Sequence, residues 1–169
     1  MPLAAIEALL DDSSDAQVRR LWEALDAAGL SSQARHTGAT KAPHLTLVSA
    51  PLIDGGHVDL AGARLGPLLP IRVRVTGLAL LGDGPRHALA LLCAVPSPVV
   101  AAVEELARAV GDPRAGAWVP HLTLGRRLTG TQVARALEVL GEQRIPLERL
   151  VLDRVRRWDP ATRSVTAVS

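Results

Sequence analysis

The pentapeptide Pro-His-Leu-Thr-Leu occurs twice in this chain, at residues 43–47 and again at residues 120–124. Each copy runs into apolar or β-branched residues, a pattern typical of a β-strand. Side chains two residues apart on a strand share a face, so His44 lies beside Thr46, and His121 beside Thr123, with the leucines on the opposite face. The leucines predict two buried strand faces. The His/Thr pairs predict a cleft that receives two imidazoles and two hydroxyls.

The order of predicted elements around the first copy is repeated around the second. The first half shows a strand over 2–10, a helix whose stripe runs from Val18 to Leu25 and ends at Gly29, a loop over 31–42, the first motif, a helix over 58–65 and a strand over 71–76. The second half shows a strand over 87–95, a helix over 97–110, a loop over 112–119, the second motif, a helix over 131–141 and strands over 147–158 and 164–168. The repeated order indicates an internal duplication.

A duplicated α+β unit packs most simply about a pseudo-two-fold axis, which would bring the two motif strands face to face. We therefore expect one domain over residues 1–169 with two lobes, approximately 1–82 and 83–169, between which strands can be exchanged. Each half reads β-α-β-α-β with the motif on its middle strand. Antiparallel sheets should line a central cleft, with the helices outside.

Composition narrows the class of protein. Apolar residues make up 48% of the chain and charged residues 21%, which is typical of a globular protein. Phe and Tyr are absent, so the core must be aliphatic and any base-stacking platform must be Trp or Arg. Trp22 lies on the apolar stripe of the first helix and is expected in the core. Lys41 is the only lysine, so the positive charge is carried by arginines, whose planar fork suits phosphate.

The number of cysteines and the length of the apolar stretches bear on the cellular compartment and on membrane insertion. A single cysteine, Cys93, excludes an intramolecular disulfide and fits a reducing compartment. No stretch approaches the roughly 18 apolar residues that span a bilayer, and no basic segment precedes the apolar N-terminus. We expect a cytoplasmic monomer that does not contact a membrane.

The two His-x-Thr motifs resemble those of the 2H phosphoesterase superfamily, and within it the bacterial 2′-5′ RNA ligase, or RNA 2′,3′-cyclic phosphodiesterase, group. The second motif, which continues into Gly125 and Arg126, is especially similar to that group. The first departs from the family pattern, because it continues as Val48-Ser49-Ala50 where a Phe-Leu-Gly stretch is common. The resemblance extends over the whole chain in element order and over the two motifs in residues.

This resemblance implies a metal-independent phosphodiesterase without a cofactor. Its expected partner is RNA or a nucleotide with a 2′,3′-cyclic phosphate, hydrolysed to the 2′-phosphate, with 2′-5′ ligation as the reverse reaction. Histidine titrates near neutrality, so one ring can serve as base and the other as acid, while threonine hydroxyls donate to the non-bridging oxygens. By analogy with the family, His121 is the expected base and His44 the acid, although the symmetry of the motifs makes these roles exchangeable.

Three further residues are candidates for substrate binding. Arg126 and Arg127 follow the second motif, and strict alternation along the strand places Arg127 on the face of His121. Trp118 lies three residues before that histidine and could stack on a nucleobase; packing beneath the loop is the competing interpretation.

Other kinds of site find less support. The motif histidines lie on separate strands without a carboxylate or thiol at ligand spacing, so a metal site is not expected. Cys93 lies in an apolar run, and no serine occupies a nucleophile elbow. His36, His57 and His87 lack a partner motif. Two alternatives stay open: an RNA- or nucleotide-binding module of the same fold, and a cyclic phosphodiesterase of a small metabolite such as an ADP-ribose cyclic phosphate.

Overall fold

The computed structural model describes the chain apart from residues 1–2, 36–37, 39–40, 144–148 and 169. Its strands are β1 (Ala4–Leu10), β2 (His44–Ala50), β3 (Ile71–Leu81), β4 (His87–Ala94), β5 (His121–Leu128), β6 (Leu150–Asp159) and β7 (Ser164–Val168). Its α-helices are α1 (Asp12–Ala27), α2 (Gly55–Leu65), α3 (Ser97–Val110) and α4 (Gly130–Glu142). The order β-α-β-α-β occurs twice, which confirms the duplicated α+β fold. The predicted strand starts at residues 2 and 147, and His36, lie outside the described residues.

All strand pairs are antiparallel, and the sheet order is β1-β2-β5-β4-β3-β6-β7, with a further pairing of β1 and β6. The two motif strands β2 and β5 meet at a single pair, Leu45 opposite Leu122. The strands β3 and β6 meet through Ile71–Val73 and Leu150–Leu152. Two short junctions thus join two larger groups of strands.

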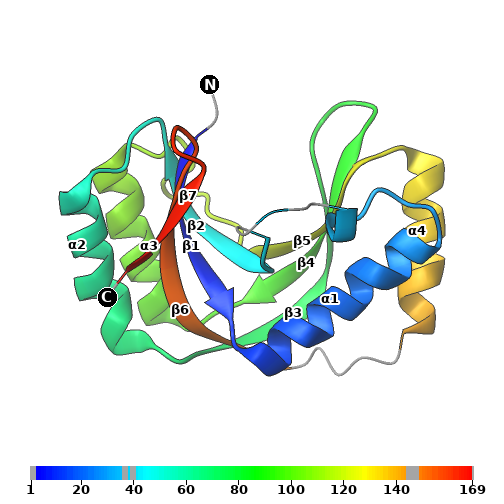
Figure 1. Cartoon of the computed structure of the whole chain (residues 1–169), viewed down its shortest axis with the longest axis horizontal. Helices are drawn as coiled ribbons and strands as arrows, with labels where there is room; N and C mark the ends of the chain where they lie inside the picture. Colours follow the sequence, from blue (N-terminus) through cyan, green and yellow to red (C-terminus); the bar gives the residue numbers. More distant parts are fainter. Residues whose placement is uncertain (1–2, 36–37, 39–40, 144–148, 169) are drawn as a thin grey trace.

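Each lobe combines elements from both halves of the sequence (Figure 1). Strands β1, β2, β6 and β7 are covered by α2 and α3, whereas β3, β4 and β5 are covered by α1 and α4. Helix α1 packs on β5 of the second half, and α3 packs on β2 of the first. A division near residue 82 therefore separates the sequence halves, while the packed lobes exchange elements across it.

The N-terminus of α1 lies earlier than the sequence suggests. The start of the apolar stripe at Val18 predicts Ser14 or Asp15 as the cap, but Asp11 is the N-cap and accepts a hydrogen bond of 2.8 Å from the Ser14 amide. The Ser14 hydroxyl is buried instead, where it accepts from the Val151 amide at 3.0 Å. Its side chain thereby links the first helix to β6 rather than capping its own helix end.

Two other helices begin at, or within one residue of, the expected position. Helix α3 starts at Ser97 as expected, with Pro96 as its N-cap. Helix α4 begins after Thr129, which forms a capping box with Gln132. Such small differences fall within the usual variation of helix boundaries and leave the buried stripes as expected.

The core is aliphatic, as the absence of Phe and Tyr predicts. The motif leucines Leu45, Leu47, Leu122 and Leu124 are each at most 1% exposed and belong to one continuous cluster. This placement confirms that the leucine face of each motif is buried.

Among the helices of the described residues, none has the length and apolar character to cross a bilayer.

A buried carboxylate anchors the loop before β5. Asp112 is 4% exposed and accepts a 2.7 Å hydrogen bond from the Ser49 amide on β2. Burial opposes its charged form, but hydrogen bonds from Arg114 and Ser49 outweigh burial and hold the pKa of Asp112 below its usual range. The carboxylate therefore ties the approach to the second motif onto the strand that carries the first.

Candidate functional site

Both motif histidines have the same local geometry. His44 Nδ1 lies 2.8 Å from the carbonyl oxygen of Ala42, and His121 Nδ1 lies 2.7 Å from that of Val119. A carbonyl oxygen only accepts, so each Nδ1 carries the hydrogen. The Nε2 atom of each ring is thereby the one available to exchange a proton with a ligand.

The short junction between β2 and β5 sets the relative placement of the motifs. Leu45 lies opposite Leu122 in an antiparallel pair. One residue beyond this pair lie His44 and Thr123 on one side, and Thr46 and His121 on the other. Since side chains alternate along a strand, these four side chains point to the face opposite the leucines.

Two tryptophans fix the motif strands through their indole N–H groups. Trp22 Nε1 donates to the Thr123 carbonyl oxygen at 3.0 Å, and Trp118 Nε1 donates to the Thr46 carbonyl oxygen at 2.9 Å. Trp118, a candidate for base stacking from the sequence, packs against the core cluster in this position. Trp22 is 4% exposed and thus buried, as expected, yet its ring also lines a cavity beside the first motif.

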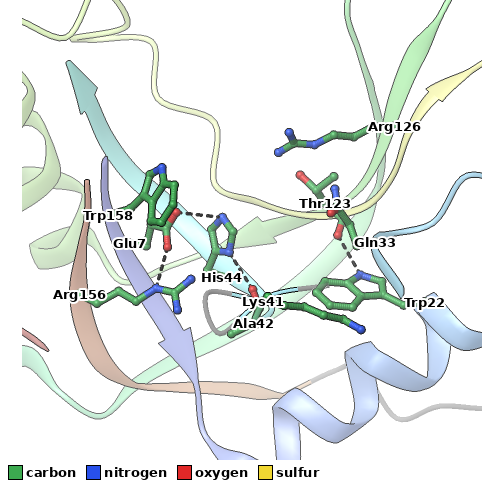
Figure 2. Close-up of a pocket in the computed structure, with 11 residues that line it drawn as sticks. Glu7, Trp22, Gln33, Lys41, Ala42, His44, Thr123, Arg126, Arg156 and Trp158 are labelled. Carbon is green, nitrogen blue, oxygen red and sulfur yellow. Dashed lines mark hydrogen bonds and ion pairs between the residues drawn. The ribbon is translucent and has the colours of Figure 1, made fainter. Parts of the chain in front are cut away.

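A cavity of about 220 Å³ lies beside the first motif (Figure 2). It is lined by Glu7, Trp22, Gln33, Gly38, Lys41, Ala42, His44, Thr123, Arg126, Arg156 and Trp158. Two of the four motif residues, His44 and Thr123, contribute to this lining from the two lobes. Thr46 and His121 lie on the same two strands, outside the set of lining residues. Figure 2 shows His44 and Glu7 on one side of the cavity, with Thr123 and Arg126 on the other.

Of the two arginines that follow the second motif, Arg126 lines the cavity, whereas strict alternation predicted that Arg127 would share the face of the motif histidine. The reason is that the pairing of β5 with β4 slips twice between Thr123 and Leu128, each time adding one residue to β5. Arg127 adopts a φ of 59°, a left-handed conformation that interrupts the pleat. The prediction from simple alternation is therefore wrong beyond Thr123.

The second slip is accompanied by a close backbone approach that requires glycine. A Cβ atom on Gly125 would lie 2.6 Å from the carbonyl oxygen of Ser31. The segment that carries Ser31 pairs with β5 through Ser32, and the Arg126 amide donates to the Ser31 carbonyl at 3.3 Å. This contact holds Gln33 and Arg126 at the same side of the cavity.

We expect Gly125→Ala to lower the free energy of unfolding by about 1–3 kcal/mol, because backbone atoms must shift to admit the methyl group. Chemical denaturation followed by circular dichroism measures the change. Gly141→Ala is the matched control, since its added Cβ meets no atom within 4 Å and it lies in α4, where alanine is the better helix former. Equal unfolding free energies for the two variants would contradict the proposed crowding.

A buried ion pair lies next to the first motif, and the described residues include none beside the second. Arg156 Nε donates to Glu7 Oε2 at 2.8 Å, and Glu7 Oε1 lies 3.4 Å from His44 Nε2. The Glu7 and Arg156 side chains are 8% and 9% exposed. On β1, Glu7 pairs with Thr46, whereas the equivalent partner of Thr123 on β4 is Ala90. The duplication is thus broken chemically, because a carboxylate accompanies one histidine and a methyl group occupies the corresponding position by the other.

Several cavity residues were not identified from the sequence: Glu7, Gln33, Lys41, Arg156 and Trp158. A signal existed for Glu7, which is the only charged residue in the apolar strand β1. The alternation of Arg156 and Trp158 on β6 was a second signal, but their partner Glu7 lies 149 positions away from Arg156 in the sequence. Only the pairing of β1 with β6 brings these residues together.

Two further reactive side chains of the described residues, those of Cys93 and His57, lie outside the cavity lining. Burial raises the pKa of the Cys93 thiol to about 12, so a thiolate nucleophile is not available there. His57 caps α2 through Asp54. Among the described residues, no three His, Cys, Asp or Glu side chains gather into a group that could hold a metal ion.

A duplicated α+β fold with two His-x-Thr strands meeting at its axis defines the class of 2H phosphoesterases. The chain belongs to the 2′-5′ RNA ligase superfamily, whose family model matches residues 10–163. The expected family is therefore confirmed. A comparison with curated proteins finds no match.

Solved structures with the same fold include proteins of three organisms. TT0787 of Thermus thermophilus has a TM-score of 0.58 at 17% identity, with 99% of this chain and 96% of that chain covered. Escherichia coli LigT complexed with 3′-AMP has a TM-score of 0.55 at 13% identity, covering 99% and 94%. Kluyveromyces marxianus Usb1 with uridine monophosphate has a TM-score of 0.53 at 12% identity, covering 98% and 97%. At these identities the likeness concerns the fold alone.

Proposed function

We propose that this chain is a metal-independent phosphodiesterase that opens 2′,3′-cyclic phosphates at the ends of RNA or on nucleotides and leaves a 2′-phosphate. The observation that carries the proposal is the matched geometry of His44 and His121, with Nδ1 bound to a carbonyl and Nε2 available on adjoining strands. Membership of the superfamily supports a phosphoesterase or ligase type of enzyme. The nucleotides bound by LigT and Usb1 support a nucleotide or RNA partner.

The reaction requires one proton to be taken and one to be given. His121 Nε2 removes a proton from water as its oxygen forms the new bond to phosphorus. The bond between phosphorus and the ribose 3′-oxygen breaks, and His44 donates a proton to that oxygen. Each of these transfers contributes roughly 10²- to 10⁴-fold to the rate. The hydroxyls of Thr46 and Thr123 donate to the non-bridging oxygens. A ribose 5′-hydroxyl that attacks in place of water, with the same bond to the 3′-oxygen breaking, would form a 2′-5′ linkage.

The buried ion pair supports this division of roles. Both ring nitrogens of His44 face an oxygen, namely the Ala42 carbonyl and the Glu7 carboxylate, an arrangement that the doubly protonated ring of an acid satisfies. His121 Nε2 has no hydrogen bond or ion pair within the described part of the chain, as suits a base that must accept a proton. The asymmetry therefore favours the roles that the family analogy implies.

The cavity lining indicates how the substrate is held. We assign the phosphate contact to Arg126, which lines the cavity and pairs with no carboxylate of the described residues, rather than to Arg127. Trp22 and Trp158 line the same cavity and offer faces for a base, whereas Trp118 holds β2 through its indole N–H. Trp118 thus acts on the site through Thr46.

Incubation of the protein with a 2′,3′-cyclic mononucleotide in EDTA tests the proposal, with products resolved by ³¹P NMR. We expect the 2′-nucleotide to accumulate with no requirement for added metal. Binding without hydrolysis would instead favour the nucleotide-binding module. Hydrolysis confined to an ADP-ribose cyclic phosphate would favour the metabolite-directed enzyme.

A further inference from the structure

A second hollow carries an unusual concentration of positive charge. It has a volume of about 490 Å³ and is lined by Arg72 and Arg74 of β3, by Arg149 just before β6, and by the segment 94–96 at the end of β4. All three arginine side chains belong to exposed residues. We call this hollow, with these three arginines, the arginine groove.

No carboxylate belongs to the lining of the arginine groove in the part of the chain that the structure describes. Among the described residues, none of its three arginine side chains makes a hydrogen bond or an ion pair. By contrast, Arg64 pairs with Glu105 and Arg135 pairs with Glu138. Gathering three uncompensated guanidinium groups raises the local positive potential, which is unfavourable unless an anion is bound. The guanidinium fork matches phosphate oxygens, so phosphate is the anion that this chemistry suits.

The first residues of α3 reinforce this preference. Pro96 lines the groove and is the N-cap of α3, a helix of 14 residues. The N-terminal end of a helix carries a partial positive charge and backbone N–H groups without helical partners. The helix end and the arginines therefore both attract a bound anion.

The strand register links the arginine groove to the second motif. On β4, Leu92 pairs with His121 of β5, and Ala94 pairs with Arg74 of β3. Leu92 and Ala94 are two residues apart and share a face, so His121 and Arg74 lie on the same face of the sheet. Two strand spacings across and two residues along correspond to about 12 Å between their Cα atoms. A short single strand can span that distance.

We propose that the arginine groove binds phosphates of an RNA strand upstream of the cyclic phosphate. The substrate of this enzyme is then the 3′ end of an oligonucleotide rather than a mononucleotide or a small metabolite. The inference rests on the proposed function and deepens it, because it names the substrate class of the same site. A positively charged groove that follows the backbone is how single-strand binders gain affinity without reading sequence.

The test compares two substrates on one enzyme: a ten-nucleotide RNA ending in a 2′,3′-cyclic phosphate, and 2′,3′-cyclic UMP. In the wild-type protein we expect the oligonucleotide to have the higher kcat/KM. In the triple variant Arg72→Gln, Arg74→Gln, Arg149→Gln, the ratio of the two kcat/KM values should fall about tenfold or more. The salt dependence of RNA binding should also weaken, with a log–log slope smaller by about 2, since each lost phosphate contact on a single strand contributes about 0.7.

The control removes the same charge from outside the site. The triple variant Arg64→Gln, Arg108→Gln, Arg135→Gln alters exposed arginines on α2, α3 and α4 and should leave the ratio unchanged. If the groove variant keeps the wild-type ratio while both substrates are hydrolysed, the proposal that the groove binds RNA is wrong, and the proposed phosphodiesterase activity is supported. If the wild-type protein hydrolyses neither substrate, the proposed function fails. Fluorescence anisotropy with a labelled RNA that bears a 3′-phosphate then tests whether the arginine groove binds RNA. Loss of affinity only in the groove variant supports it, and equal affinity overturns it.

Discussion

Replacing either motif histidine by alanine is expected to lower kcat for 2′,3′-cyclic nucleotide hydrolysis by about 10²- to 10⁴-fold, with little change in nucleotide affinity. In the proposed mechanism each ring moves one proton through Nε2, so the loss of either ring removes one of the two proton transfers. Stopped assays give kcat, and calorimetry gives affinity. His57→Ala is the matched control, because that ring caps α2 through Asp54 and takes no part in the cavity lining.

The pH dependence of the same variants separates the two roles. In the proposed mechanism the base must be deprotonated, so the wild-type rate should rise with pH in the acidic range. The acid must be protonated, so the rate should fall as the pH is raised further. The bell-shaped profile should therefore lose its rising limb in His121→Ala and its falling limb in His44→Ala. Retention of the full bell by both variants would exclude the two-histidine mechanism.

Arg156→Met should destabilise the protein by about 3–5 kcal/mol, because it leaves the carboxylate of Glu7 buried without its guanidinium partner. The Glu7 side chain is only 8% exposed, so water cannot readily replace that partner. Guanidinium chloride denaturation measures the loss. The double variant Glu7→Gln, Arg156→Met should be less destabilised than Arg156→Met, since it removes the lone charge as well.

The matched control for this ion pair lies on the surface. Arg135→Met breaks the pair with Glu138, whose side chains are 55% and 64% exposed, and should cost less than about 1 kcal/mol. Similar losses for Arg156→Met and Arg135→Met would show that burial of the Glu7–Arg156 pair is energetically unimportant.

The site shows where reasoning from local pattern succeeds. The His-x-Thr alternation on β2 and β5, the buried motif leucines and the order of elements all follow from side-chain periodicity within short segments. The same alternation misplaced Arg127, because two slips in the β4–β5 register lie just beyond Thr123. A residue added to one strand changes the face of every side chain that follows it, and the need for it comes from the neighbouring strand.

The surroundings of the motif histidines could not be predicted from local pattern. Glu7 stands alone among apolar neighbours in the sequence, and its significance appears only when β6 brings Arg156 beside it and β2 brings His44. Trp22 is another example. Its position on the helical stripe predicts that it is buried, but its indole N–H also donates to Thr123, 101 positions away, and helical periodicity does not predict this hydrogen bond.

The sequence by itself determined the duplicated α+β order, the aliphatic core and the four motif residues, because these depend on periodicities and residue types within a few positions. The tertiary structure alone decided that lobes exchange elements, that Arg126 rather than Arg127 lines the cavity, and that one histidine has a carboxylate neighbour. These outcomes depend on the relative free energies of strand pairings and helix packings between residues that are far apart in the chain, and such contacts leave no local periodicity to be read.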